Sequence, residues 1–208
     1  MAGEARMKDT GCKMQDARCK MQDAAMNNIP SIETARLLLR PFTADDLDDY
    51  MRLIFADAEV MRYLPKRDLA PRERAARTLM VFAEHWSQHG LGAWAVTDKV
   101  TGELMGHCGL GPVPEAGEIE VLYSLGRPYW GQGIATEAAR ASVRFGFEQA
   151  NLTRLVAFAV PENIGSRRVM EHLGFVYEKD AHYFGLDLVQ YVLSRAQFQP
   201  DDSLFLVY

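Results

Sequence analysis

The stretch Tyr129-Trp130-Gly131-Gln132-Gly133-Ile134-Ala135-Thr136-Glu137-Ala138 is the point around which the rest of the chain is organised. Residues 119–125 before it are apolar at every second position, as in a strand, whereas residues 135–149 after it have helical spacing. The two glycines lack the Cβ atoms that would keep a ligand from the backbone, and the helix start adds free N–H groups and about half a positive charge. The stretch therefore predicts an anion-binding turn suited to a pyrophosphate, and it leaves open which cofactor carries that group.

The chain of 208 residues has the composition of an ordinary globular protein. Charged residues make up 25% and hydrophobic residues 48%, and the length favours one domain. A net charge of -5 argues against nucleic-acid binding, which requires clustered Lys and Arg. No apolar run reaches the roughly 18 residues of a membrane span and no signal peptide is recognisable, so we expect a cytoplasmic protein without nucleic-acid or membrane contacts.

The cysteines and histidines do not indicate a metal site. Cys12, Cys19 and Cys108 make an odd count without metal-ligand spacing, so we interpret them as reduced thiols. His85 and His89 are one helical turn apart, but no Glu of a zinc-protease motif lies between them and no third ligand is evident.

The N-terminal stretch contains a direct repeat of Cys-Lys-Met-Gln-Asp-Ala, which begins at Cys12 and again at Cys19. Two copies are fewer than a coiled coil requires, and the repeat lacks Leu and Ile. We therefore expect residues 1–30 to form a flexible tail, residues 31–198 to form the folded domain, and residues 199–208 to be a C-terminal extension.

The pattern of the remaining chain predicts an α/β fold. A first strand is expected at residues 36–41, and helices are expected after Thr43, from Pro71 to Gly90, at residues 135–149 and at residues 166–173. Hairpin signals joined to one crossover predict a mixed sheet with helices packed on it. The further strands are expected at residues 93–98, 104–110, 118–125, 155–160, 175–178 and 186–193.

A second motif follows the quoted stretch, namely Pro161-Glu-Asn163-Ile-Gly-Ser166-Arg-Arg-Val-Met-Glu-His-Leu-Gly174-Phe175. The two motifs together resemble the GNAT superfamily of acyl-CoA-dependent N-acetyltransferases, and most of all its RimJ/RimL-like branch. Residues 130–135 match the acyl-CoA loop of that family, except that Trp130 stands where Gln or Arg is usual. Residues 34–41 also resemble the first strand of the branch, so the resemblance spans residues 32–198.

The resemblance implies a mixed, mostly antiparallel sheet with flanking helices, in which the central parallel strands at residues 118–125 and 155–160 splay apart. The gap would admit the pantetheine arm of acetyl-CoA, which would act as the acyl donor. Backbone groups of the strand at residues 118–125 would bind pantetheine, and the N–H groups of residues 132–136 would hold the pyrophosphate. The residues expected to bind the cofactor are Leu122, Tyr123, Trp130, Gly131, Gln132, Gly133, Ile134, Ala135, Thr136 and Asn163.

Transfer of an acetyl group to an amine requires a base, an oxyanion donor and a partner for the leaving thiolate. Strand alternation places Glu118 and Glu120 on one face, and the resemblance favours Glu120 as the base. The oxyanion donor is expected among the backbone N–H groups of residues 122–125. Ser166 is the candidate on the thiolate side, with Asn163 positioning the cofactor, although both residues are also typical of a helix start.

Three functions remain open from the sequence. The resemblance favours an enzyme that acetylates a primary amine, either a protein N-terminus or a small molecule, as a monomer or a homodimer. A noncatalytic acyl-CoA-binding or sensor module would keep the loop without needing Glu120. An NAD-binding oxidoreductase is the third possibility, because Gly131-x-Gly133 follows a strand and Glu162 follows the next one, but Thr136 replaces the third glycine of that fingerprint.

Overall fold

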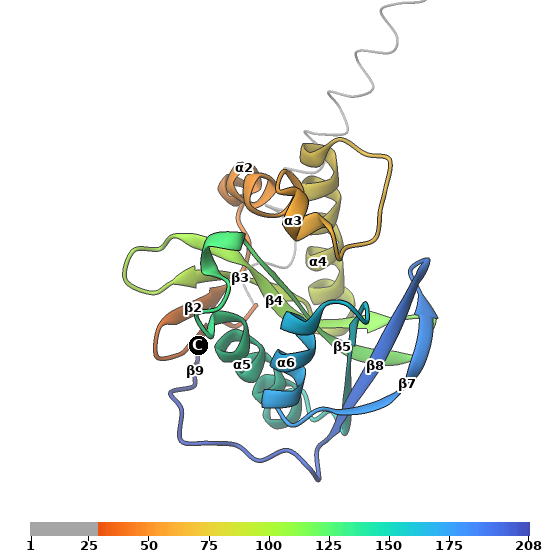
Figure 1. Cartoon of the computed structure of the whole chain (residues 1–208). Helices are drawn as coiled ribbons and strands as arrows, with labels where there is room; N and C mark the ends of the chain where they lie inside the picture. Colours follow the sequence, from red (N-terminus) through yellow and green to blue (C-terminus); the bar gives the residue numbers. More distant parts are fainter. Residues whose placement is uncertain (1–28) are drawn as a thin grey trace, which may run out of the picture.

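A nine-stranded sheet runs through the computed structural model, which describes residues 29–208 (Figure 1). The order of the strands is β7-β8-β6-β5-β4-β3-β2-β1-β9, and every neighbouring pair is antiparallel except β5 and β6. This confirms the mixed, mostly antiparallel sheet. The repeat at residues 12–24 lies outside the described residues. The strands are β1 (Ile32–Glu33), β2 (Leu37–Arg40), β3 (Ala93–Asp98), β4 (Leu104–Val113), β5 (Glu118–Leu125), β6 (Arg154–Ala159), β7 (Val176–Tyr183), β8 (Leu186–Ser194) and β9 (Leu206–Val207).

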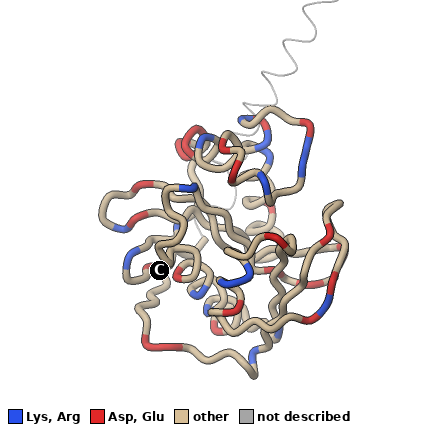
Figure 2. The backbone as a smooth tube through the Cα atoms, in the orientation of Figure 1, with Lys and Arg blue, Asp and Glu red and all other residues tan. Residues whose placement is uncertain are grey.

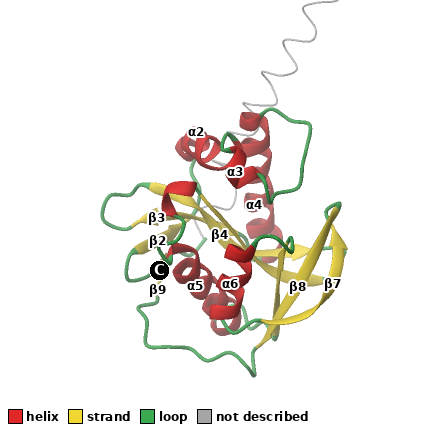
Figure 3. Ribbon diagram, in the orientation of Figure 1, coloured by secondary structure: helices red, strands yellow, loops and turns green. Residues whose placement is uncertain are grey.

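Helices cover both faces of the sheet (Figures 1 and 3). Because side chains alternate along β3, Ala95 packs with Leu79 of α4 in one buried cluster, whereas Trp94 packs with Phe145 of α5 in the other. None of the described helices is long and apolar enough to cross a membrane. The helical elements are η2 (Ala44–Asp46), α2 (Leu47–Tyr50), η3 (Met51–Phe55), α3 (Ala58–Met61), α4 (Pro71–His89), η4 (Arg127–Tyr129), α5 (Ile134–Glu148) and α6 (Ile164–His172).

The central strand β5 has a regular register on one side and an opening on the other. It pairs with β4 without interruption from Gly106↔Leu125 to Val113↔Glu118, so no bulge disturbs the alternation of its side chains. Its parallel pairing with β6 is limited to Glu120↔Val156. The two strands therefore part toward their carboxyl ends, where α5 and α6 begin.

The C-terminal segment returns to the sheet. Residues 199–208 are the part that the sequence predicts to be a C-terminal extension. Within them, β9 pairs antiparallel with β1 at the edge of the sheet. On the way, Asp201 accepts a hydrogen bond from Arg140 of α5 at 2.5 Å, and the Arg144 guanidinium lies 4.5 Å from the centre of the Phe205 ring. This segment therefore braces the outer face of α5.

Charged residues of both signs are interspersed along the described backbone (Figure 2). Within residues 29–208, no group of three or more His, Cys, Asp or Glu side chains is placed to hold a metal ion.

Candidate active site

The turn between β5 and α5 has the form that the sequence predicts. Gly131 and Gly133 have φ values of 71° and 76°, a left-handed conformation that favours glycine, and a Cβ on Gly131 would have open space around it. α5 begins without a side-chain cap. No acceptor within residues 29–208 serves the backbone N–H groups of residues 132–136. A row of orphan donors at a helix N-terminus is the structure that binds a phosphate group.

Two side chains of the turn hold its shape. The Trp130 indole N–H donates to the Leu125 carbonyl at 2.8 Å, and the Gln132 side-chain amide donates to the Pro128 carbonyl at 2.6 Å. Trp130 therefore supports the turn through its indole N–H, although 43% of its surface stays exposed.

Arg36, which lies just before β2, anchors the turn from outside. Its guanidinium donates to the Gln132 carbonyl at 3.0 Å and pairs with the Glu137 carboxylate at 2.6 Å. Glu137 also accepts from the Thr34 hydroxyl at 2.6 Å. Partial burial acts to raise the pKa of Glu137, but the hydrogen bonds from Thr34 and Arg36 outweigh it and hold that pKa below its ordinary value. The first turn of α5 is therefore fixed to the sheet through a charged contact.

We expect Glu137→Gln to lower the free energy of unfolding by about 1 to 2 kcal/mol at pH 7, because charge-assisted hydrogen bonds from Arg36 and Thr34 are weakened. Since the folded-state pKa of Glu137 is depressed, its contribution is present above the unfolded value near ~4.3 and is lost as the pH falls through the folded value. Urea denaturation at pH 7 and pH 3 measures both.

The matched control is Glu148→Gln, which removes an i,i+4 ion pair with Arg144 on the same helix and should cost below about 0.5 kcal/mol. Equal losses for the Glu137 and Glu148 variants would show that the anchor adds nothing to stability.

Glu120 lies in the middle of β5, on the face covered by α4. Its partner in the register is Gly111, which leaves room above the sheet for the His85 ring: a Cβ on Gly111 would lie 3.5 Å from His85 Nδ1. That nitrogen is buried and has no hydrogen-bond partner among the described residues. Removal from water, with a smaller contribution from Glu115, raises the pKa of the Glu120 carboxyl to about 8. Burial likewise lowers the pKa of His85.

Glu118, the other carboxylate of this strand, is engaged elsewhere. Arg154 of β6 donates to it at 3.0 Å and also binds Glu178 of β7 at 2.8 Å. Glu120 makes no such ion pair within the described part of the chain. The two acidic residues therefore differ in their surroundings although they share a face.

Tyr123 points to the opposite face of β5, toward α5 and α6. Its hydroxyl lies 2.9 Å from Ser166 Oγ and 3.1 Å from the Ser166 carbonyl oxygen. Asn163 caps α6, because its side-chain oxygen accepts from the Ser166 N–H at 3.1 Å. Leu122, the neighbour expected to contact pantetheine, packs at the margin of the cluster under α2 and α4. The structure thus brings Tyr123, Ser166 and Asn163 together where β5 and β6 part.

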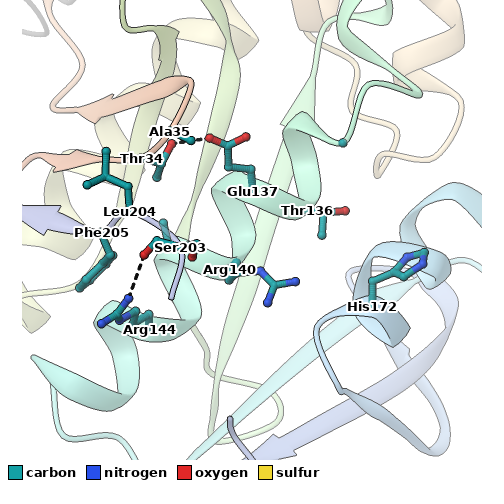
Figure 4. A pocket seen from close by; sticks show the side chains of 12 residues that line it. Thr34, Ala35, Thr136, Glu137, Arg140, Arg144, His172, Ser203, Leu204 and Phe205 are labelled. Carbon is teal, nitrogen blue, oxygen red and sulfur yellow. Dashed lines mark hydrogen bonds between the residues drawn. The ribbon is translucent and has the colours of Figure 1, made fainter. Parts of the chain in front are cut away.

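A cavity of about 470 Å³ begins beside the turn and follows the outer face of α5 (Figure 4). Thr136 and Arg140 of α5 line it together with His172 of α6 and residues 203–205 of the C-terminal segment. Sequence reasoning missed Arg36, Glu137 and Arg140. The spacing of Thr136 and Arg140 by one helical turn is a signal that could have found the last of these.

Comparison with known proteins identifies the family. The chain matches the family described as "Acetyltransferase (GNAT) domain" over residues 36–176. It is 31% identical over 156 residues to the uncharacterised protein YkkB of Bacillus subtilis, covering 74% of this chain and 90% of that one.

Solved structures also share the fold. An acetyltransferase from Agrobacterium tumefaciens has a TM-score of 0.72 at 28% identity and covers 80% of this chain and 95% of its own. Mycobacterium smegmatis RimJ, solved in complex with CoA-disulfide, has a TM-score of 0.68 at 22% identity, covering 79% and 87%. The family prediction is thereby confirmed: the chain belongs to the GNAT family and is an N-acetyltransferase whose fold matches the RimJ/RimL-like branch.

Proposed function

We propose that this enzyme moves an acetyl group from acetyl-CoA to a primary amine by direct attack, with Glu120 as the base. The observation that carries the proposal is the composition of β5. β5 carries Glu120, a half-buried carboxyl with a raised pKa, and it separates from β6 directly after this residue. The strand leads into the turn of residues 132–136, whose backbone N–H groups have no acceptor in the described part of the chain. A base, a gap between two strands and an anion-binding turn therefore follow one another along the chain.

The residues of the turn fit acetyl-CoA. The uncapped N–H groups of residues 132–136 match the pyrophosphate, and the open space at Gly131 lets that group approach the backbone. The adjoining cavity, with Arg140 and His172 at its edge, is suited to the nucleotide end. Acetyl-CoA supplies the thioester carbonyl that an amine attacks. The family membership of the chain supports the same donor.

Glu120 is suited to the role of base because its pKa of about 8 lies close to the working pH. A carboxylate of ordinary acidity would take a proton from an ammonium ion far less readily. Glu118 has the same orientation, but Arg154 holds it as an ion pair. For these reasons we assign the proton acceptor to Glu120 and not to Glu118.

The acceptor is proposed to be a primary amine that reaches Glu120 from the side of α4. Glu115 in the β4–β5 turn places a negative charge near Glu120, which favours a group that arrives as a cation. Protein N-termini, including those of ribosomal proteins, and small polyamines carry such a group.

The direct test is the release of CoA thiol by the purified protein, with acetyl-CoA as donor and a panel of N-terminal peptides, polyamines and aminoglycosides as acceptors. We expect release that depends on at least one amine and an acetylated product of the corresponding mass. Thermal shifts with CoA but not with NAD are expected in parallel. Stabilisation by CoA without transfer to any amine would favour the noncatalytic module, and stabilisation by NAD alone would overturn the proposal.

A further inference from the structure

A hydroxyl pair bridges the opening between β5 and β6. Tyr123 comes from β5 and Ser166 from the first full turn of α6, so their contact at 2.9 Å spans the gap just beyond the last paired position, Glu120↔Val156. The turn of residues 132–136 lies at the same carboxyl ends of these strands, where α/β proteins bind ligands. A flexible arm that enters the gap from that turn therefore passes this pair.

The hydrogens of the pair can be counted. Tyr123 has one hydroxyl hydrogen and two acceptors within reach, the Ser166 carbonyl oxygen and Ser166 Oγ. The Ser166 carbonyl oxygen also accepts the i→i+4 bond of α6, so donation of the tyrosine hydrogen to Ser166 Oγ leaves that carbonyl with a partner. If Tyr123 donates to Ser166 Oγ, the hydroxyl hydrogen of Ser166 is left for a third partner. In the reverse arrangement Ser166 donates to Tyr123 and has no hydrogen left for a ligand.

We propose that Tyr123 is a positioning residue for the leaving thiol, because its hydroxyl donates to Ser166 Oγ and turns the hydroxyl hydrogen of Ser166 toward the sulfur of CoA. This inference rests on the proposed function. Glu120 and Tyr123 lie on opposite faces of β5, so the proton acceptor serves the amine and the hydroxyl pair serves the thiol.

In the transfer step Glu120 accepts a proton from the amine, whereas the hydroxyl pair only provides a hydrogen bond to the leaving sulfur. An amine that arrives as a cation first loses one proton to water. Its neutral nitrogen then bonds to the acetyl carbon, the electron pair of the broken C–S bond stays on sulfur, and the second proton of the nitrogen goes to Glu120. Ser166 and Tyr123 keep their hydrogens and only share them. Burial raises the pKa of Tyr123 well above its ordinary value, so its hydroxyl remains a donor.

The test measures the ionisation of the thiol of bound CoA, which is read from the ultraviolet absorbance of the thiolate against pH, with S-methyl-CoA as the blank. We expect Tyr123→Phe to lower the acid dissociation constant of the bound thiol about tenfold, the effect of one hydrogen bond. Ser166→Ala should lower it at least as much, and the double variant no further than Ser166→Ala. The kcat of acetyl transfer should fall about tenfold for Tyr123→Phe, with the KM for acetyl-CoA changed by less than about twofold.

Tyr191→Phe is the matched control. Tyr191 is a buried tyrosine of β8 whose hydroxyl donates to Glu171 at 3.1 Å and accepts from Arg167 at 3.2 Å, both on α6, without touching Ser166. The substitution Tyr191→Phe should therefore leave the ionisation of the bound thiol unchanged. The same result for Tyr123→Phe, or additive losses in the double variant, would overturn this inference while leaving the proposed function in place. Failure of the unaltered protein to bind CoA would overturn both.

Discussion

Replacing Glu120 with Gln is expected to lower kcat/KM for amine acetylation by about 10²- to 10⁴-fold above pH 8, the range that a general base contributes. The side chain keeps its size but can no longer accept a proton. In the unaltered enzyme the carboxyl ionises around its pKa of about 8, so activity should rise with pH through that value and then level off. The variant should lack this rise when both proteins are measured with an amine whose own pKa lies well above 8, so that ionisation of the acceptor does not coincide with that of Glu120. Affinity for acetyl-CoA should change little, because the turn lies at the other end of β5.

The same substitution should stabilise the protein at alkaline pH. The pKa of Glu120 is raised in the folded state, so the stability that the neutral carboxyl contributes is present below the unfolded value near ~4.3 and is lost as the pH rises toward about 8. Gln carries no such dependence, and its Tm should exceed that of the unaltered enzyme at pH 8 and approach it at pH 4.

Glu118→Gln is the companion variant, since it alters the neighbouring carboxylate of the same face and releases Arg154. A pH profile that is unchanged in Glu120→Gln, together with a larger loss in Glu118→Gln, would contradict the assignment and move the base to Glu118.

Gly133→Val is expected to weaken CoA binding by about 100-fold or more. Gly133 has a φ of 76°, a conformation that valine does not adopt without strain, so the start of α5 must shift and its N–H groups turn away from the pyrophosphate. The loss of two charge-assisted hydrogen bonds of about 1.5 kcal/mol each accounts for this factor. Isothermal titration with CoA measures it.

Gly102→Val supplies the control for strain alone. Gly102 has a φ of 75° and open space around its Cβ position, and it lies in the β3–β4 hairpin. We expect both variants to lose similar stability, about 1 to 2 kcal/mol, and only Gly133→Val to lose CoA affinity. Undiminished CoA binding by a folded Gly133→Val protein would contradict the placement of the cofactor at this turn.

The fold was predictable where the pattern is local and strong. The glycines of the quoted stretch and the alternation around Glu120 place β5, the turn and α5 within a residue of their observed bounds. The helix expected from Ser166 begins at Ile164 instead, because Asn163 is the cap and Ser166 lies in the first turn.

The bounds of the strands at the edges of the sheet could not be predicted from the sequence. β7 continues to Tyr183, beyond the predicted residues 175–178, because most of this edge strand is exposed on both faces and shows no apolar alternation. β1 and β9 have two residues each, too few to show any period. In the centre of the sheet, β4 also extends past residue 110 to Val113.

In the candidate site too, features with a local sequence pattern could be predicted, whereas contacts between distant positions could not. The common face of Glu118 and Glu120 follows from period two along one strand and could be predicted. The contacts of Arg36 with Glu137, and of Tyr123 with Ser166, join positions 101 and 43 residues apart, and a single sequence has no local signal for such pairs. These contacts depend on how the crossover through α5 returns the chain to the sheet.

The alternation of β5 also bears on how such enzymes diversify. Side chains that would meet the acceptor lie on the face under α2 and α4, whereas the hydroxyl pair and the turn lie with α5 and α6. Substitutions in residues 43–85 are therefore expected to reshape the proposed acceptor pocket without moving the groups proposed to bind the acetyl donor. For protein engineering, this half of the molecule is the natural place for randomised libraries that seek new amine substrates.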